Sequence, residues 1–172
     1  MRRARSAALA RSCVQLAADH LEEGDVAVAW YIFFKAIQWQ QISMMEGWGQ
    51  RDNSLGRFGT RFAREARTHD AGDIETTFDE LANLDAASVT SRLAAAPAWA
   101  HERNDRSWRS RRAIGEPVTR LESDRDVLRV CTIYGLRAVE GPPYPRWHAI
   151  PERADIQQRL NRLRDTLGQL QA

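Results

Sequence analysis

The chain has 172 residues, 43% of them hydrophobic, which is the size of one domain with one buried core. Charged residues make up 28% of the chain but the formal net charge is only +2, so no overall field commits the protein to nucleic acid or to anionic lipid. The longest strongly apolar run, residues 26–34, is far shorter than the ~20 residues of a membrane-spanning helix. These features favour a cytoplasmic globular protein without a membrane partner.

The basic side chains and the cysteines carry little functional information. Lys35 is the only lysine among 25 basic residues, which fits either a GC-rich genome or selection for bidentate contacts to oxyanions. Cys13 and Cys131 both lie in apolar helical patterns, and no metal-ligand spacing surrounds either. We therefore expect two reduced core cysteines.

A first helix is predicted over residues 3–23. Its apolar stripe has steps of four, three and four, and we expect it to face the core: Leu9, Cys13, Leu16 and His20. His20 is accordingly expected to be a core histidine. Gly24 ends this helix, and the Asp25 side chain is expected to cap the free amides of the next one.

The second predicted helix, residues 26–45, is apolar around most of its circumference. Its faces carry these residues: Ala29, Tyr31, Phe33, Phe34, Ala36, Ile37 and Gln38. A helix that is apolar nearly all round is buried. Trp30 and Trp39 could line a pocket, but core packing is the simpler interpretation. The sequence thus predicts the central helix of an all-α bundle.

The following segment alternates loops with shorter helices. Glycines and an Asp-Asn-Ser cluster predict a loop over residues 47–59. Helices are expected over residues 61–68 and 74–84, the second with Ile74, Phe78 and Leu81 on one stripe. Further helical pieces are expected over residues 87–96 and 118–139. Residues 1–140 are therefore predicted to form an all-α, single-domain bundle of about five to six helices.

The C-terminal region divides into a linker and a last helix. Proline-rich residues 141–153 are expected to be a non-helical strap. Residues 154–172 predict a helix with a leucine-heptad seam, which consists of Ile156, Leu160, Leu163, Leu167 and Leu170. The seam spans just over two heptads, so docking onto the bundle and pairing with another chain both stay open. In the second case the five seam residues bind the partner.

The stretch "AWYIFFKA" resembles the central helix of HEPN-superfamily domains, which are small prokaryotic helical bundles. The resemblance implies a homodimer or a protein partner such as a nucleotidyltransferase, and many such domains are non-catalytic binding modules. Active members are metal-independent ribonucleases that use an arginine and a nearby histidine. Arg64 and His69 have the required kind of spacing and are the candidate catalytic pair.

A later stretch is basic and contains a tryptophan. Phosphate contact and base stacking would require the residue types that it provides: Arg103, Asn104, Arg106, Trp108, Arg109, Arg111 and Arg112. Arg103 with Asn104 also has the form of the family's late motif, but no histidine follows at the required spacing. Alternatively, this basic arm pairs with the acidic residues between 70 and 85 or is solvated.

Neither a phosphate-binding loop nor a dinucleotide fingerprint, metal-spaced cysteine or histidine set, or nucleophile elbow is present, so we expect no cofactor and no metal. The leading hypothesis is a cytoplasmic, HEPN-like and non-catalytic interaction or regulatory module that self-associates or binds a protein through its last helix. The alternatives are a metal-independent ribonuclease and a nucleic-acid-binding protein that uses the basic arm.

Overall fold

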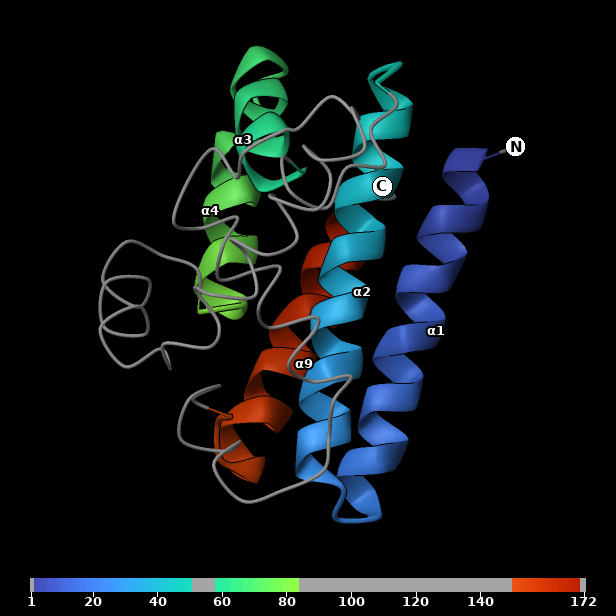
Figure 1. The fold of residues 1–172 in the computed structure, drawn as a ribbon, viewed down its shortest axis with the longest axis vertical. Coiled ribbons are helices and arrows are strands. Elements are labelled where there is room, and N and C mark those ends of the chain that lie inside the picture. Colours follow the sequence, from blue (N-terminus) through green and yellow to red (C-terminus); the bar gives the residue numbers. More distant parts are fainter. Residues whose placement is uncertain (1, 51–57, 84–149, 171–172) are drawn as a thin grey trace, which may run out of the picture.

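The computed structural model describes residues 2–50, 58–83 and 150–170. These residues form five α-helices and no strand: α1 (Arg2–Glu22), α2 (Val26–Gly47), α3 (Phe58–Thr68), α4 (Gly72–Leu81) and α9 (Arg153–Gln169). Figure 1 shows α1 and α2 as a long antiparallel hairpin, with α9 alongside α2 and the α3–α4 pair beyond. The predicted all-α bundle is confirmed for this part of the chain. The helices expected over residues 87–96 and 118–139, Cys131, and residues 141–149 of the strap lie outside it.

Helix α2 is the centre of the bundle, as its sequence predicts. It contacts α1, α3 and α9. Its side chains Trp30, Phe33 and Phe34 are 1%, 0% and 2% exposed, and the rings of Trp30 and Phe33 stack with centroids 5.3 Å apart. The indole Nε1 of Trp30 is buried and has no hydrogen-bond acceptor among the described residues. Trp30, Phe33 and Phe34 therefore belong to the core, whereas Tyr31 and Trp39 of the same helix are half-buried.

Helix α1 packs on α2 mainly through small residues. Ala10 and Ala17 of α1 are 0% exposed, as are Ala29 and Ala36 of α2. Side chains this small allow two helix backbones to approach closely. The far end of the hairpin is held by a hydrogen bond of 2.9 Å that the Ser6 hydroxyl donates to a Glu46 carboxylate.

The apolar stripe predicted for this helix is wrong. The buried face consists of Ser6, Ala10, Val14, Ala17, Ala18 and Leu21. Leu16 is 47% exposed, and Leu9, Cys13 and His20 are half-buried at the edges of the helix contact. The buried face of α1 thus combines small residues with Val14 and Leu21, and Leu16 lies outside it.

A Schellman motif joins α1 to α2. Gly24 has φ +90°, its N–H donates to the Leu21 carbonyl (3.3 Å), and the Asp25 N–H donates to the His20 carbonyl (2.9 Å). The predicted side-chain cap at Asp25 is wrong, because its carboxylate makes no hydrogen bond to the amides of α2. Asp25 begins α2 through its main chain alone, since its carbonyl accepts from the Ala29 N–H at 2.9 Å.

Helices α3 and α4 each begin two or three residues earlier than expected. Phe58 in the first turn of α3 is 3% exposed and stacks with Phe62, so the helix begins inside the glycine-rich stretch that was predicted to be a loop. Phe78 and Leu81 of α4 are 0% and 1% exposed, which confirms the predicted stripe. The Phe62 and Phe78 rings are 6.3 Å apart and hold the two helices together.

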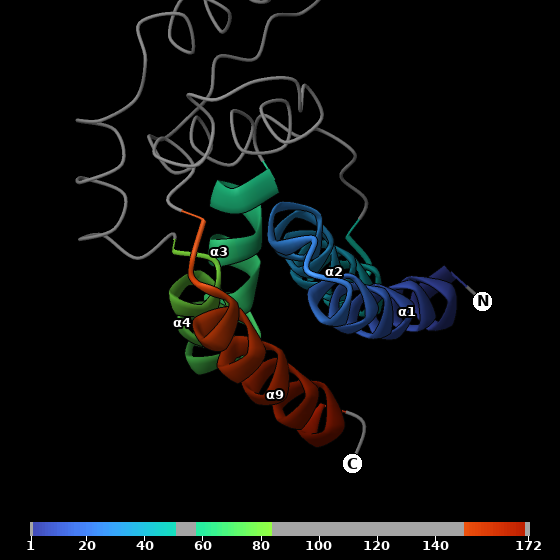
Figure 2. The same ribbon diagram turned by 90° about the horizontal axis from the view of Figure 1, so that it is seen from below.

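Helix α9 docks on its own chain, beside α2 in both Figures 1 and 2. Ile156, Leu160 and Leu163 are 0% exposed and Leu167 is 4% exposed, while half-buried Leu170 packs against the same core. The helix contacts both α1 and α2. Of the two alternatives left open by the sequence, this structure shows docking onto the bundle, and pairing of the seam with another chain stays a prediction.

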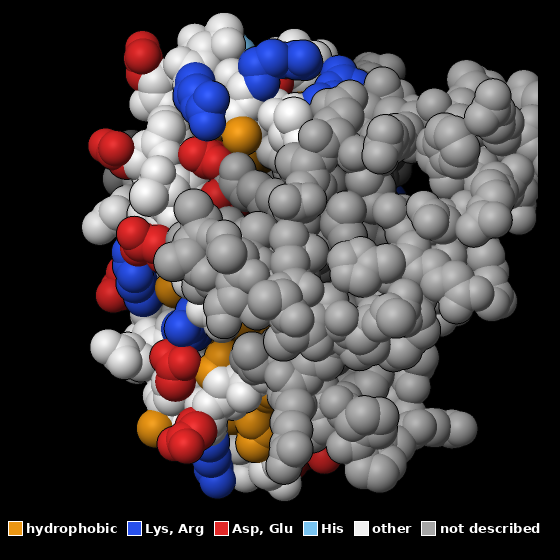
Figure 3. All heavy atoms as spheres, turned by 60° about the vertical axis from the view of Figure 1, so that its left-hand side comes forward, with side chains coloured by type: hydrophobic (Ala, Val, Ile, Leu, Met, Phe, Trp, Pro, Cys, Tyr) orange, Lys and Arg blue, Asp and Glu red, His pale blue; other side chains and the backbone are white. Residues whose placement is uncertain are grey.

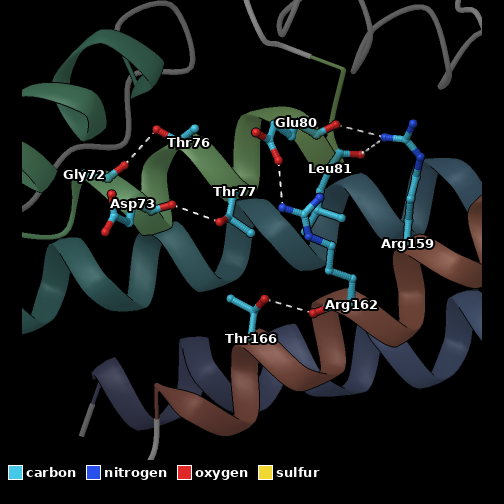
Figure 4. A network of polar contacts seen from close by, with 9 residues as sticks. All are labelled: Gly72, Asp73, Thr76, Thr77, Glu80, Leu81, Arg159, Arg162 and Thr166. Atoms are coloured by element: carbon cyan, nitrogen blue, oxygen red, sulfur yellow. Dashed lines mark hydrogen bonds and ion pairs between the residues drawn. The ribbon is translucent and has the colours of Figure 1, made fainter.

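Two arginines of α9 hold the end of α4 (Figure 4). Arg159 Nη1 donates to the carbonyls of Glu80 at 2.9 Å and of Leu81 at 2.8 Å, which lie in the last turn of α4. The same guanidinium lies 5.8 Å from the Trp30 ring centroid. Arg162 Nη2 is 2.7 Å from Glu80 Oε2. A cation at these carbonyls also compensates the negative end of the helix dipole.

Candidate functional site

Arg64 and His69, the candidate catalytic pair, lie near the C-terminal end of α3, and their side chains contact different residues. Arg64 is exposed, and its Nε and Nη2 donate to Oε1 of Glu65 at 3.2 and 3.1 Å. His69 stacks on Trp48 with ring centroids 4.9 Å apart and planes 6° apart. Five residues of an α-helix turn through about 140°. The spacing alone therefore does not bring these two side chains to one point.

The other predicted sites are either buried or outside the described residues. The five seam residues of α9, from Ile156 to Leu170, pack in the chain's own core, so they could meet a partner only if α9 undocked. The basic arm, from Arg103 to Arg112, lies outside the described residues. Figure 3 shows acidic and basic side chains interspersed over the described part of the face that it draws. Within the described residues, no helix is both long and apolar enough to cross a membrane.

The outer face of α1 is a surface that the sequence analysis missed. In Figures 1 and 2, α1 lies at the edge of the bundle with α2 on one side only. A run of exposed residues follows its length, and we call it the outer stripe: Arg5, Ala8, Ser12, Leu16 and Asp19. The steps between them are three, four, four and three residues, so the five side chains share one helical face. Among the described residues, Leu16 is the one large hydrophobic residue that is exposed, at 47%.

The charges of α1 are separated along the helix. Its first half carries exposed arginines, namely Arg2, Arg3, Arg5 and Arg11. Its last turns and the residues that follow carry exposed carboxylates, namely Asp19, Glu22, Glu23 and Asp25. The arginines lie toward the positive, N-terminal end of the helix dipole and the carboxylates toward its negative, C-terminal end. Both interactions with the dipole are unfavourable, because a dipole favours acids at the N-terminus and bases at the C-terminus. Such an arrangement is stabilised when charge of the opposite sign is brought to each end.

One group of potential metal ligands lies at the α1–α2 turn. Donor atoms of His20, Glu23 and Asp25 all lie within 4.8 Å of one another. His20 Nδ1 is 3.5 Å from Glu23 Oε2 and 3.8 Å from Asp25 Oδ2. The sequence signal was the glycine between the two acids, because a Schellman turn brings the residues on either side of it together.

The Cys13 thiol shows no sign of reactivity. It is free and half-buried at the edge of α1. Burial raises its pKa above the ordinary value, and the nearby charge of Lys35 offsets only part of that rise. A raised pKa keeps the sulfur protonated at neutral pH and therefore weakly nucleophilic.

No family model, curated protein or solved structure matches the chain. The resemblance to HEPN domains at residues 29–36 therefore stays a prediction from the sequence. Function has to be inferred from the surfaces described above.

Proposed function

We propose that the protein is a helical interaction module that forms a homodimer by antiparallel pairing of the outer stripes of two copies. The observation that carries this proposal is the symmetry of the stripe. Its residue steps of three, four, four and three are the same when read from either end, with Ser12 at the middle. A two-fold axis next to Ser12 would therefore make the stripe complementary to itself, as an isologous interface requires.

The side chains along the stripe match under that symmetry. Arg5 would face Asp19 of the second copy, and Asp19 would face Arg5 of the second copy. Ala8 would face Leu16, so that the exposed leucine packs over a small residue. Parallel pairing would instead set arginine beside arginine and carboxylate beside carboxylate, so the charges of α1 specify the antiparallel orientation.

The affinity of such a dimer should be modest. Exposed ion pairs contribute at most ~1 kcal/mol each, so they determine orientation more than strength. One pair of surface helices buries less than the ~1,200 Å² of a stable interface. We therefore expect a reversible dimer in which burial of Leu16 supplies most of the affinity. A homodimer is also what the HEPN resemblance implies, and free Cys13 supports a location in the cytoplasm.

A charge-swap series tests the dimer by sedimentation equilibrium over a concentration range. Arg5→Glu and Asp19→Arg should each shift the protein to monomer, because each sets like charges against one another. The double variant should restore the dimer, since every stripe pair again joins opposite charges. Arg67→Glu, an exposed arginine of α3, is the control and should leave the association constant unchanged.

Two results would overturn the proposal. One is a wild-type protein that stays monomeric at every accessible concentration. The other is a dimer whose association constant is the same in the wild type and in both single variants. Circular dichroism of each variant confirms that the helices are retained.

The ribonuclease alternative has less support, because Arg64 is engaged by Glu65 and His69 is stacked on Trp48. Incubation of the protein with RNA and a chelator separates the two functions. Cleavage that is lost in His69→Ala would favour the nuclease. The nucleic-acid-binding alternative, through the basic arm, requires an affinity that falls steeply with added salt.

A further inference from the structure

We infer that His20, Glu23 and Asp25 form a binding site for a divalent transition-metal ion, with Zn²⁺ as the ion best suited to it. The site lies at the turn between α1 and α2. It combines one imidazole nitrogen with two carboxylates, which is a mixed set of donors and more than a group of acidic side chains.

The two distances from the imidazole to the carboxylates are close to those around a coordinated ion, and all three donor atoms lie within 4.8 Å of one another. Ligands about 2.0–2.1 Å from a tetrahedral Zn²⁺ lie roughly 3.3–3.4 Å from one another. His20 Nδ1 is already 3.5 Å from Glu23 Oε2 and 3.8 Å from Asp25 Oδ2. Both carboxylates are largely exposed, at 67% and 64%, so small side-chain rotations can bring them in. Three protein ligands would leave the fourth position to water.

The backbone fixes where these side chains start. In the Schellman motif, the Asp25 N–H donates to the His20 carbonyl five residues earlier in the chain. Such motifs commonly place an apolar contact at or near this pair. Here a histidine and an aspartate occupy it, with Glu23 directly before the glycine. The turn thus brings three metal-ligand residue types close together.

The imidazole itself supplies an independent observation. The His20 side chain is 27% exposed, but its Nδ1 atom is shielded from solvent and makes no hydrogen bond within the described residues. A buried polar atom without a partner is costly, and a metal ion would use its lone pair. The two carboxylate oxygens that face it cannot donate a hydrogen bond to it when they are ionised.

The charge around the turn also favours a cation. Asp19 and Glu22 lie next to the three ligands, and His20 is the basic residue in the last turn of α1. The C-terminal end of a helix carries partial negative charge. Two carboxylate ligands neutralise a divalent ion, and the surrounding acids add attraction for it.

The donor set distinguishes between classes of metal. Mg²⁺ and Ca²⁺ prefer sites built from oxygen alone, whereas imidazole suits Zn²⁺ and its neighbours in the first transition series. Co²⁺ is a useful spectroscopic substitute, because the intensity of its visible absorption depends on coordination geometry. We expect Zn²⁺ to bind at least tenfold more tightly than Mg²⁺.

The test is a calorimetric titration of the untagged, metal-free chain with Zn²⁺, repeated with Mg²⁺. Glu23→Gln should weaken the Zn²⁺ affinity by about tenfold or more, as for loss of one carboxylate ligand. Glu22→Gln removes the same charge one residue away and should change the affinity by no more than about twofold. His20→Asn should abolish the visible Co²⁺ absorption of a tetrahedral site.

Binding also has to stabilise the fold, so a given excess of Zn²⁺ should raise the melting temperature of the wild type more than that of Glu23→Gln. The inference is overturned if Zn²⁺ does not bind, or if Glu23→Gln and Glu22→Gln weaken it equally. It also fails if binding survives in His20→Asn, which would place the ion on other donors. Because Glu23 is exposed, its variant keeps the test decisive even if His20→Asn folds poorly.

Discussion

Helices α1 and α9 both pack on α2, but they do so by different means. Helix α1 is joined to α2 by a short turn and meets it through alanines that are 0% exposed. Helix α9 comes from a distant part of the sequence, and it brings large side chains together with two arginines that hold α4. Closing a long loop costs more conformational entropy than closing a short turn. The difference teaches that a neighbouring helix can dock largely through small residues with few polar contacts, whereas the distant helix uses larger side chains and arginines that bind the end of another helix.

The largest effect is expected in the α9 contact. Leu163→Ala removes a side chain that is 0% exposed and should lower the free energy of unfolding by about 3 kcal/mol. Urea denaturation followed by circular dichroism measures this loss. Gln157→Ala, on the exposed face of the same helix, should cost no more than ~0.5 kcal/mol. A small effect at Leu163 would mean that α9 contributes little to the core.

The α1 contact should instead be sensitive to added volume. Ala17→Leu inserts a bulky side chain between two closely packed helices and should cost about 2 kcal/mol. Ala4→Leu adds the same volume at an exposed position of α1 and should be nearly neutral in the same urea denaturation. If both variants were equally stable, the α1–α2 contact would not depend on small residues, and the contrast with α9 would disappear.

The smallest effect concerns the polar contacts between α9 and α4. Arg159→Ala removes the donors to the Glu80 and Leu81 carbonyls and should cost about 1.5 kcal/mol. Arg159→Lys keeps the charge but cannot reproduce the planar guanidinium, so its loss in urea denaturation should be intermediate. Equal stability of wild type and Arg159→Ala would show that apolar packing alone positions α9.

The sequence predicted those parts of the fold that depend on large apolar residues at helical spacing. The burial of Trp30, Phe33 and Phe34 in α2, the stripe through Phe78 and Leu81, and the seam of α9 are of this kind. Such residues have one energetically acceptable place, which is the core. The pattern therefore decides the outcome before tertiary structure is considered.

The same reasoning failed for α1 because alanine carries a weak hydrophobic signal. The sequence pattern predicts that the face with Leu16 is buried, but the face with Ala10 and Ala17 packs on α2. Size complementarity with α2 decides which face packs. At Asp25 the residue type suited a cap, but the Schellman hydrogen bond draws its side chain toward His20. The contacts of Arg159 were not predictable, since backbone carbonyls at a helix end leave no mark in the sequence.

The buried N–H of Trp30 shows what the centre of the molecule requires from this residue. An indole contributes both a large flat surface and a donor, and here the donor has no acceptor among the described residues. The surface is fully used, against Phe33 on one side and near the Arg159 guanidinium. The interior thus uses both the bulk and the electron-rich face of this tryptophan.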